Sequence, residues 1–307
     1  MDIIIENLVK SIDGRKAIDS ISFQGRRGEI VGLFGPKGSG KSTTLKIIAG
    51  ILPADSGSVT YAQSDPPPSP AKLKHRLGYL FEQNPLYGKM DIVDFLHLIT
   101  RLHGIRNGEA TARTKEVISL CGLEKEKHKT IQELSRGCRQ RLGIAQALIH
   151  NPDVLILDEP IAGLDPKQST AIQNIIKEVK KDRVTLLSSR TMNEIETTCD
   201  RFIIMNQGKV MFNGTTAEFL RQSETDLRFR VCIKGGDSAQ IHAVLASLPH
   251  IQKITVASDC NFVCQCLSGS EFESAIFNVC QKNNWYISEL TPIQTRMEDI
   301  FHKFTQN

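Results

Sequence analysis

The chain has 307 residues and a formal net charge of +4, and hydrophobic residues make up 40% of it. This length and composition predict about two folded domains and argue against a disordered or collagen-like chain. The eight cysteines form no C-x-x-C pair, which argues against a disulfide framework, and the small, dispersed charge argues against nucleic acid as a partner.

No targeting signal is expected in the N-terminal segment. It begins MDIIIENLVK, without the basic, apolar or arginine-rich preamble of a secretory or transit peptide. No apolar run approaches the ~18 residues of a membrane-spanning helix. We therefore expect a cytoplasmic protein that reaches a membrane only through a partner.

The first two thirds of the chain alternate short apolar strands with helical periodicity, which predicts a mostly parallel sheet with helices on its faces. A proline-rich segment, 63–70, is expected to be an exposed excursion on an antiparallel hairpin. The expected strands are 3–5, 18–23 (after a turn at Asp13-Gly14), 29–34, 154–157 and 185–187, and the expected helices are 41–49, most of 91–127, 139–149 and 167–180.

The pattern changes after Leu220, and 222–226 is expected to link two domains, 1–221 and 222–307. The second domain has the order β-α-β-β-α-β of a ferredoxin-like fold, followed by a helix at 295–304. Its strands and helices are expected at 227–233, 238–248, 251–256, 262–267, 271–281 and 286–290. Its expected core includes Phe229, Val231, Val244, Leu248, Ile254, Val256, Val263 and Ile276, and Cys264 and Cys266 are expected to share one strand face.

A phosphate-binding loop is predicted where a buried strand runs into a helix. The nine residues that fit G-x-x-x-x-G-K-[ST] are Gly35, Pro36, Lys37, Gly38, Ser39, Gly40, Lys41, Ser42 and Thr43. Such a loop turns backbone N–H groups toward a phosphate at the positive end of the helix. Lys41 is expected to reach the β- and γ-phosphates, and Ser42 is expected to hold Mg²⁺.

A pair of carboxylates follows the apolar strand 154–157. Asp158 suits a role in holding Mg²⁺, and Glu159 is placed to act as general base toward the attacking water. A phosphate-binding loop combined with this pair predicts a nucleotide hydrolase that uses ATP and Mg²⁺.

The segment Leu134-Ser-Arg-Gly-Cys138 opens a predicted helix and narrows the class. Here the sequence resembles the ABC ATPases, whose signature L-S-G-G-Q is matched at Leu134, Ser135 and Gly137 but not at Arg136 and Cys138. The resemblance covers about residues 1–220. It implies an α/β P-loop NTPase with antiparallel β and α-helical subdomains. It also implies a head-to-tail dimer, in which Ser135 and Gly137 bind the partner's ATP and the loop 162–166 lies across the interface.

Within this family the chain looks like the ATP-binding subunits of ABC-2 type exporters, and is most similar to the gliding-motility-associated group, in which an extra C-terminal domain is usual. The resemblance rests on 78–87, on 131–160 and on Met297-Glu-Asp-Ile-Phe301. It implies a homodimer or a paired ATPase subunit, bound peripherally to an integral-membrane permease on the inner face of the cell membrane. The surface between the proline-rich excursion and Leu120 would receive that permease.

Three positions depart from the family pattern. Glu82 stands where the family has a glutamine that senses Mg²⁺ and γ-phosphate, and Gln83 follows one residue late, so either can have this role. Arg190 stands where the family has a histidine that contacts the γ-phosphate, and Ile12 replaces the usual aromatic platform for adenine. An arginine cannot both donate and accept hydrogen bonds, which favours slow hydrolysis.

Two other functions compete with transport. A non-transport ABC ATPase acting on nucleic acid or a ribosome would be favoured by a duplicated ATPase core, but the P-loop occurs once. A P-loop kinase of a small metabolite does not account for the signature segment. The sequence alone favours the transport ATPase.

Overall fold

The structure, a computed structural model, describes residues 1–62, 75–221, 227–249, 251–258, 260–266, 269–293 and 301. The chain divides into two compact units, Met1–Thr216 and Ala217–Asn307. This division falls within the helix that precedes the expected linker. The linker at 222–226, the proline-rich excursion at 63–70 and all of the expected last helix except Phe301 lie outside the described residues.

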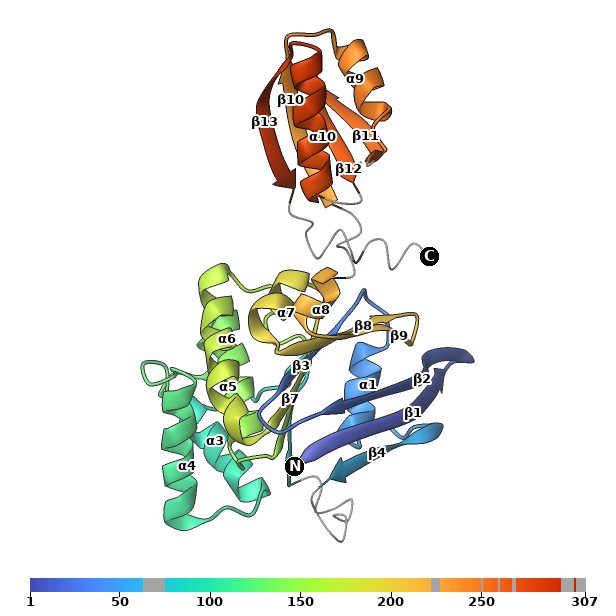
Figure 1. The fold of residues 1–307 in the computed structure, drawn as a ribbon. Helices are drawn as coiled ribbons and strands as arrows, with labels where there is room; N and C mark the ends of the chain where they lie inside the picture. The colour runs from blue at the N-terminus through green and yellow to red at the C-terminus, as the bar shows by residue number, and fades with distance from the viewer. Residues whose placement is uncertain are drawn as a thin grey trace. The chain divides into compact units, whose positions relative to one another are not determined.

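A six-stranded sheet in the order β5-β6-β7-β3-β8-β9 forms the centre of the first unit (Figure 1). Its strands are β3 (Ile30–Phe34), β5 (Leu77–Leu80), β6 (Val154–Leu157), β7 (Val184–Ser189), β8 (Arg201–Asn206) and β9 (Lys209–Gly214). Neighbouring strands are parallel except β8 and β9, so the predicted parallel sheet is confirmed. Strands β3 and β6 are buried along their whole length, which explains their continuous apolar sequences.

A second, antiparallel sheet has the order β2-β1-β4, formed by β1 (Asp2–Ile12), β2 (Arg15–Gly25) and β4 (Ser56–Ala62). The turn at Asp13-Gly14 joins β1 to β2, as predicted. The strands on either side of 63–70 do not pair with each other, in contrast to the predicted hairpin. Strand β4 pairs with β1, whereas β5 pairs with β6 in the other sheet, because β5 is a buried apolar strand suited to a parallel sheet.

Helices cover the six-stranded sheet of the first unit (Figure 1). They are α1 (Lys41–Ile48), α3 (Ile92–Leu102), α4 (Asn107–Leu120), α5 (Arg136–Leu148), α6 (Pro166–Val179) and α7 (Met192–Thr198), with short 3₁₀ turns at Ile131–Glu133 and Lys180–Asp182. A further helix, α8 (Thr216–Arg221), begins at the last residue of this unit. Helices α3, α4 and α5 pack against one another, and α5 also packs against β5. Side chains of α1 and of both sheets share one apolar core, in which Ile3, Leu45 and Ile156 are fully buried. This core fixes α1 under the end of β3.

The second unit is a ferredoxin-like α+β domain, as predicted. Its antiparallel sheet has the order β11-β12-β10-β13. Its elements are β10 (Leu227–Lys234), α9 (Ser238–Ala246), β11 (Ile251–Ser258), β12 (Asn261–Cys266), α10 (Gly269–Lys282) and β13 (Tyr286–Ile293). Alternate residues of β10, namely Phe229, Val231 and Ile233, pack in one core with side chains of α9 and α10. Both helices therefore cover the same face of the sheet.

Three positions of the predicted core of this unit are wrong. Val256 is 53% exposed, and Val244 and Val263 are only half-buried and lie outside the core cluster. On β12 the buried face consists of Phe262, Cys264 and Cys266. Val263 alternates with these residues and therefore points to the opposite face, because successive side chains of a strand point to opposite faces.

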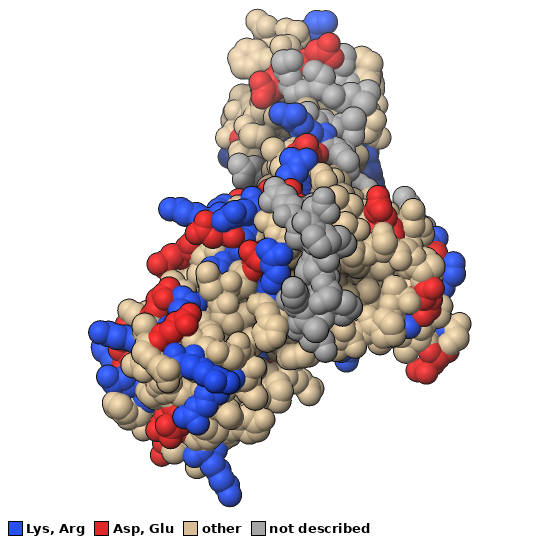
Figure 2. Space-filling view, turned by 90° about the horizontal axis from the view of Figure 1, so that it is seen from below, with Lys and Arg blue, Asp and Glu red and all other residues tan. Residues whose placement is uncertain are grey.

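Acidic and basic side chains are interspersed over the face of the molecule that Figure 2 shows. Among the described residues, no helix is long and apolar enough to cross a membrane. The described residues also contain no group of three or more His, Cys, Asp or Glu side chains that could hold a metal ion.

Removing the second unit should leave a working nucleotide-binding unit. We expect a chain truncated after Leu220 to fold and to bind ATP within about threefold of the full chain, because each unit has its own core. Thermal unfolding followed by circular dichroism and titration with a fluorescent ATP analogue would test this. An insoluble fragment that cannot bind ATP would mean that the C-terminal segment completes the first unit.

Candidate nucleotide-binding site

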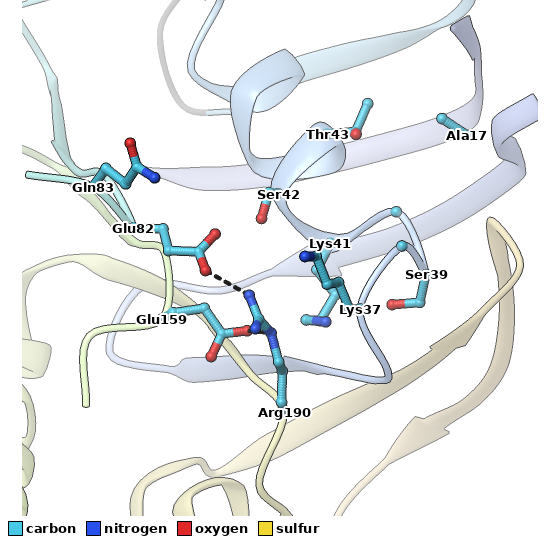
Figure 3. A pocket seen from close by; sticks show the side chains of 12 residues that line it. Ala17, Lys37, Ser39, Lys41, Ser42, Thr43, Glu82, Gln83, Glu159 and Arg190 are labelled. Carbon is cyan, nitrogen blue, oxygen red and sulfur yellow. Dashed lines mark hydrogen bonds and ion pairs between the residues drawn. The ribbon is translucent and has the colours of Figure 1, made fainter. Parts of the chain in front are cut away.

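A cleft of about 420 Å³ opens where the parallel strands of the first unit end (Figure 3). Four segments meet there because the strands run in register: the loop after β3, Glu82 and Gln83 after β5, Glu159 after β6, and Arg190 after β7. Ligands of open α/β sheets bind at this edge. The lining residues are Ala17, Lys37, Gly38, Ser39, Gly40, Lys41, Ser42, Thr43, Glu82, Gln83, Glu159 and Arg190.

The predicted phosphate-binding loop joins β3 to α1 and lines the cleft. Gly40 has φ 104°, and a Cβ there would lie 2.6 Å from the carbonyl oxygen of Ala17, so only glycine fits. Lys41 is buried, and its ammonium donates to the carbonyl oxygens of Gly35 at 2.7 Å and Pro36 at 3.1 Å. Burial lowers the pKa of Lys41, while the carboxylate of Glu159 opposes this shift. The loop thus holds a desolvated cation at the first turn of a helix.

Asp158 lies beneath the cleft, in a short hydrogen-bonded chain. Its Oδ1 accepts from Ser42 Oγ at 2.9 Å and from Ser188 Oγ at 2.6 Å. Ser188 Oγ in turn accepts from the backbone N–H of Glu159 at 2.8 Å. Sequence reasoning missed Ser188. The feature that could have identified it is a hydroxyl residue near the end of an apolar strand, β7, which pairs with the strand that precedes Asp158.

Glu159 is the buried carboxylate of the cleft. Its backbone has φ 51°, the left-handed region that a glutamate rarely adopts, at the turn that follows β6. Desolvation raises the pKa of Glu159, and the charges of Arg190 and Lys41 oppose this rise. Glu159 Oε1 lies 3.0 Å from Arg190 Nε. The arrangement provides a buried base with a guanidinium beside it.

Arg190 also contacts Glu82, whose Oε1 lies 2.5 Å from Arg190 Nη2. In Figure 3 the side chain of Glu82 is directed at Arg190, whereas that of Gln83 lies farther from it. Both Glu82 and Gln83 line the cleft. Ile12 is not among its lining residues and is 43% exposed, while Ala17 lines the cleft.

The signature segment lies outside this cleft. Ser135 caps α5, and its Oγ accepts from the backbone N–H of Cys138 at 3.2 Å. Arg136 donates to the carbonyl oxygen of Ala162 at 2.7 Å. A Cβ on Gly137 would lie 2.4 Å from the Oε1 atom of Gln168, which is held in the first turn of α6. The segment is therefore packed against the loop 162–166 of the same chain.

Comparison with known proteins decides the family. A model described as "ABC transporter" matches residues 18–162, from β2 to the turn after β6. The linearmycin resistance ATP-binding protein LnrL of Bacillus subtilis is 32% identical over 82% of this chain and 81% of its own length. An uncharacterized ABC transporter ATP-binding protein of the same organism, YxlF, is 30% identical over 97% of this chain and 98% of its own length. The chain belongs to the ABC transporter ATP-binding proteins.

Solved structures agree with this assignment. The ADP conformation of an ATP-binding cassette of an ABC transporter is 27% identical, with a TM-score of 0.61, over 71% of this chain and 92% of that one. The predicted fold class is thus confirmed, and the protein is an ABC ATPase that binds and hydrolyses ATP. The ABC family match includes the phosphate-binding loop, the signature and the carboxylate pair.

Proposed function

We propose that this ABC ATPase is the ATP-hydrolysing subunit of an ABC-2 type exporter, held on the cytoplasmic face of a membrane by a separate permease. The observation that carries the proposal is the match to a relative named an ABC transporter ATP-binding protein over 97% of this chain. The name of a second relative, a resistance protein, supports export rather than uptake. The finer resemblance to the gliding-motility-associated group rests on sequence motifs alone.

Mg²⁺ fits the oxygen donors of the cleft. The hydroxyl of Ser42 and the carboxylate of Asp158 lie within hydrogen-bonding distance of each other, and Glu82 lines the same cleft. Hydroxyl, carboxylate and phosphate oxygens are the ligands that Mg²⁺ prefers. Ser42 would bind the ion directly, with Asp158 behind it and Glu82 at the open side. The ion would neutralise charge on the phosphates.

Different residues of this chain have different roles in ATP hydrolysis. Lys41 and the backbone N–H groups of residues 35–43 hold the phosphates. Glu159 accepts the proton of the attacking water, for which its buried position and raised pKa suit it. Arg190 offers a fixed positive charge beside Glu159, in the cleft that the phosphate-binding loop also lines.

The signature supports a dimer with a second copy or a paired ATPase subunit. Ser135 and Gly137 begin a 13-residue helix whose first turn contains no acidic residue. A helix N-terminus of this kind favours an anion. Since the segment does not line the cleft of its own chain, it is free to contribute to the ATP site of a partner.

Purification of the tagged full chain from its native membranes in detergent tests the proposal. We expect a membrane-spanning protein to co-purify. Tyr87, 58% exposed on the surface predicted to receive the permease, provides a variant, Tyr87→Ser, that should reduce this recovery without changing ATP affinity. Met211, exposed on β9 outside that surface, provides the matched control Met211→Ser. Recovery of ribosomes or nucleic acid in place of a membrane protein would favour the non-transport alternative.

Arg190→His is expected to raise ATP turnover by about fivefold. An imidazole can both donate and accept a hydrogen bond at the γ-phosphate, and one improved hydrogen bond to a charged group corresponds to about this factor. Steady-state phosphate release at saturating ATP measures the effect. A fall in kcat would contradict this prediction and show that the charge of Arg190 stabilises the transition state of hydrolysis in addition to binding the phosphate.

A further inference from the structure

The two departures Glu82 and Arg190, 108 positions apart in the chain, form an ion pair in the cleft (Figure 3). Glu82 follows β5 and Arg190 follows β7, while Glu159 at the end of the intervening strand β6 contacts the same guanidinium. Nη2 of Arg190 is occupied by Glu82, and its Nε by Glu159. Arg190 is thus bracketed by two carboxylates.

A bound γ-phosphate would compete for this guanidinium. The phosphate-binding loop, Glu82 and Arg190 line one cleft, so a nucleotide held by Lys41 brings its terminal phosphate toward Arg190. A guanidinium binds a phosphate through two donors at once, either Nε with Nη2 or Nη1 with Nη2, and both pairs include the Nη2 atom that Glu82 contacts. Arg190 and Glu82 are 42% and 47% exposed, so their contact can break and be replaced by water. Glu159, in contrast, is buried.

We propose that Glu82 is a positioning residue, which holds Arg190 away from the γ-phosphate position in the empty cleft and releases it when ATP binds. The inference rests on the proposed role of this cleft as the ATP site. In the exchange, Arg190 keeps Glu159 and replaces the Glu82 carboxylate by a phosphate oxygen. ADP lacks the γ-phosphate and leaves the Glu82–Arg190 pair in place. The two departures are therefore one matched unit that discriminates ATP from ADP.

A double-mutant cycle on nucleotide affinity tests the proposal. The proteins are the wild type, Glu82→Gln, Arg190→Gln and the double variant, each titrated with Mg²⁺ and either AMP-PNP or ADP. Because Mg²⁺ is present with both nucleotides, the ratio of AMP-PNP affinity to ADP affinity reports on contacts with the γ-phosphate and not on contacts with the metal. We expect Glu82→Gln to raise this ratio about two- to fivefold when Arg190 is present, the range measured for exposed ion pairs, and to leave it unchanged in the Arg190→Gln background. An equal effect in both backgrounds, or a lower ratio in Glu82→Gln, overturns the proposal.

A charge-conserving swap provides the matched control. Glu82→Gln combined with Gln83→Glu keeps the net charge of the cleft but moves the carboxylate off the ion pair with Arg190. We expect the swap to keep the raised ratio of Glu82→Gln; a return to the wild-type ratio would mean that only net charge matters and would overturn the proposal. A wild type that binds neither nucleotide would contradict the ATP site itself, a result distinct from failure of the pair.

Discussion

Lys41→Ala is expected to lower ATP affinity by roughly two orders of magnitude while leaving the fold intact. The ammonium is buried at the first turn of α1, where a phosphate would be its natural partner. Loss of a desolvated charge from a paired site commonly weakens binding by this amount. The fold should survive, because the buried ammonium costs desolvation free energy that the alanine variant does not bear. The two carbonyl oxygens that lose their donor belong to a loop.

Lys37→Ala is the matched control. Lys37 belongs to the same loop and lines the same cleft, but it is exposed. Its loss should change ATP affinity by less than about fivefold, since exposed charges contribute little. Isothermal titration with ATP, together with thermal unfolding, compares the two variants. Wild-type affinity in Lys41→Ala would contradict the phosphate-loop assignment.

Glu159→Gln is expected to keep ATP binding but to lower kcat by about 10²–10⁴-fold. The amide has nearly the size of the carboxylate but cannot accept a proton from water, and general-base catalysis contributes about this factor.

In the wild type the ionised form of Glu159 is the active one. Because burial raises its pKa above the usual 4.5, kcat should fall with decreasing pH earlier than an ordinary glutamate predicts.

The same variant should accumulate an ATP-bound dimer, since the sandwiched nucleotide is no longer consumed. Size-exclusion chromatography with light scattering in Mg-ATP measures this dimer. Glu194→Gln is the control, because Glu194 is a partly buried glutamate outside the cleft whose pKa is also raised by burial. That control should change turnover by less than about threefold. A Glu159→Gln protein that stays monomeric with ATP bound would put the dimer in doubt.

Some functional residues of the cleft could be predicted from the sequence alone, because their role depends on the strand or helix next to them in the chain. The loop at 35–43 lies between β3 and α1, and Asp158 and Glu159 follow a buried apolar strand, so each could be recognised from its neighbours in the chain. The roles of Glu82 and Arg190, in contrast, were predicted from the resemblance to the ABC ATPases, in which both positions act at the γ-phosphate. The βαββαβ order of the second unit was predicted from the local periodicity of its segments.

Contacts between distant segments were not readable. The Glu82–Arg190 pair depends on the order β5-β6-β7, which no local pattern encodes. The strands on either side of 63–70 do not pair with each other, because the partners of a strand are decided by the whole sheet and not by the loop that follows it. On β12 both alternating sets contain apolar residues, so periodicity could not decide whether Val263 or its neighbours Phe262 and Cys264 face the core.

The most direct test of the account is product analysis of ATP turnover by the purified full chain and by Glu159→Gln. The account predicts that the wild type releases ADP and inorganic phosphate in equal amounts, and that Glu159→Gln binds ATP but releases almost none of either product. ATP turnover that is unchanged in Glu159→Gln, or a phosphoryl group recovered on a small metabolite instead of in inorganic phosphate, would contradict it.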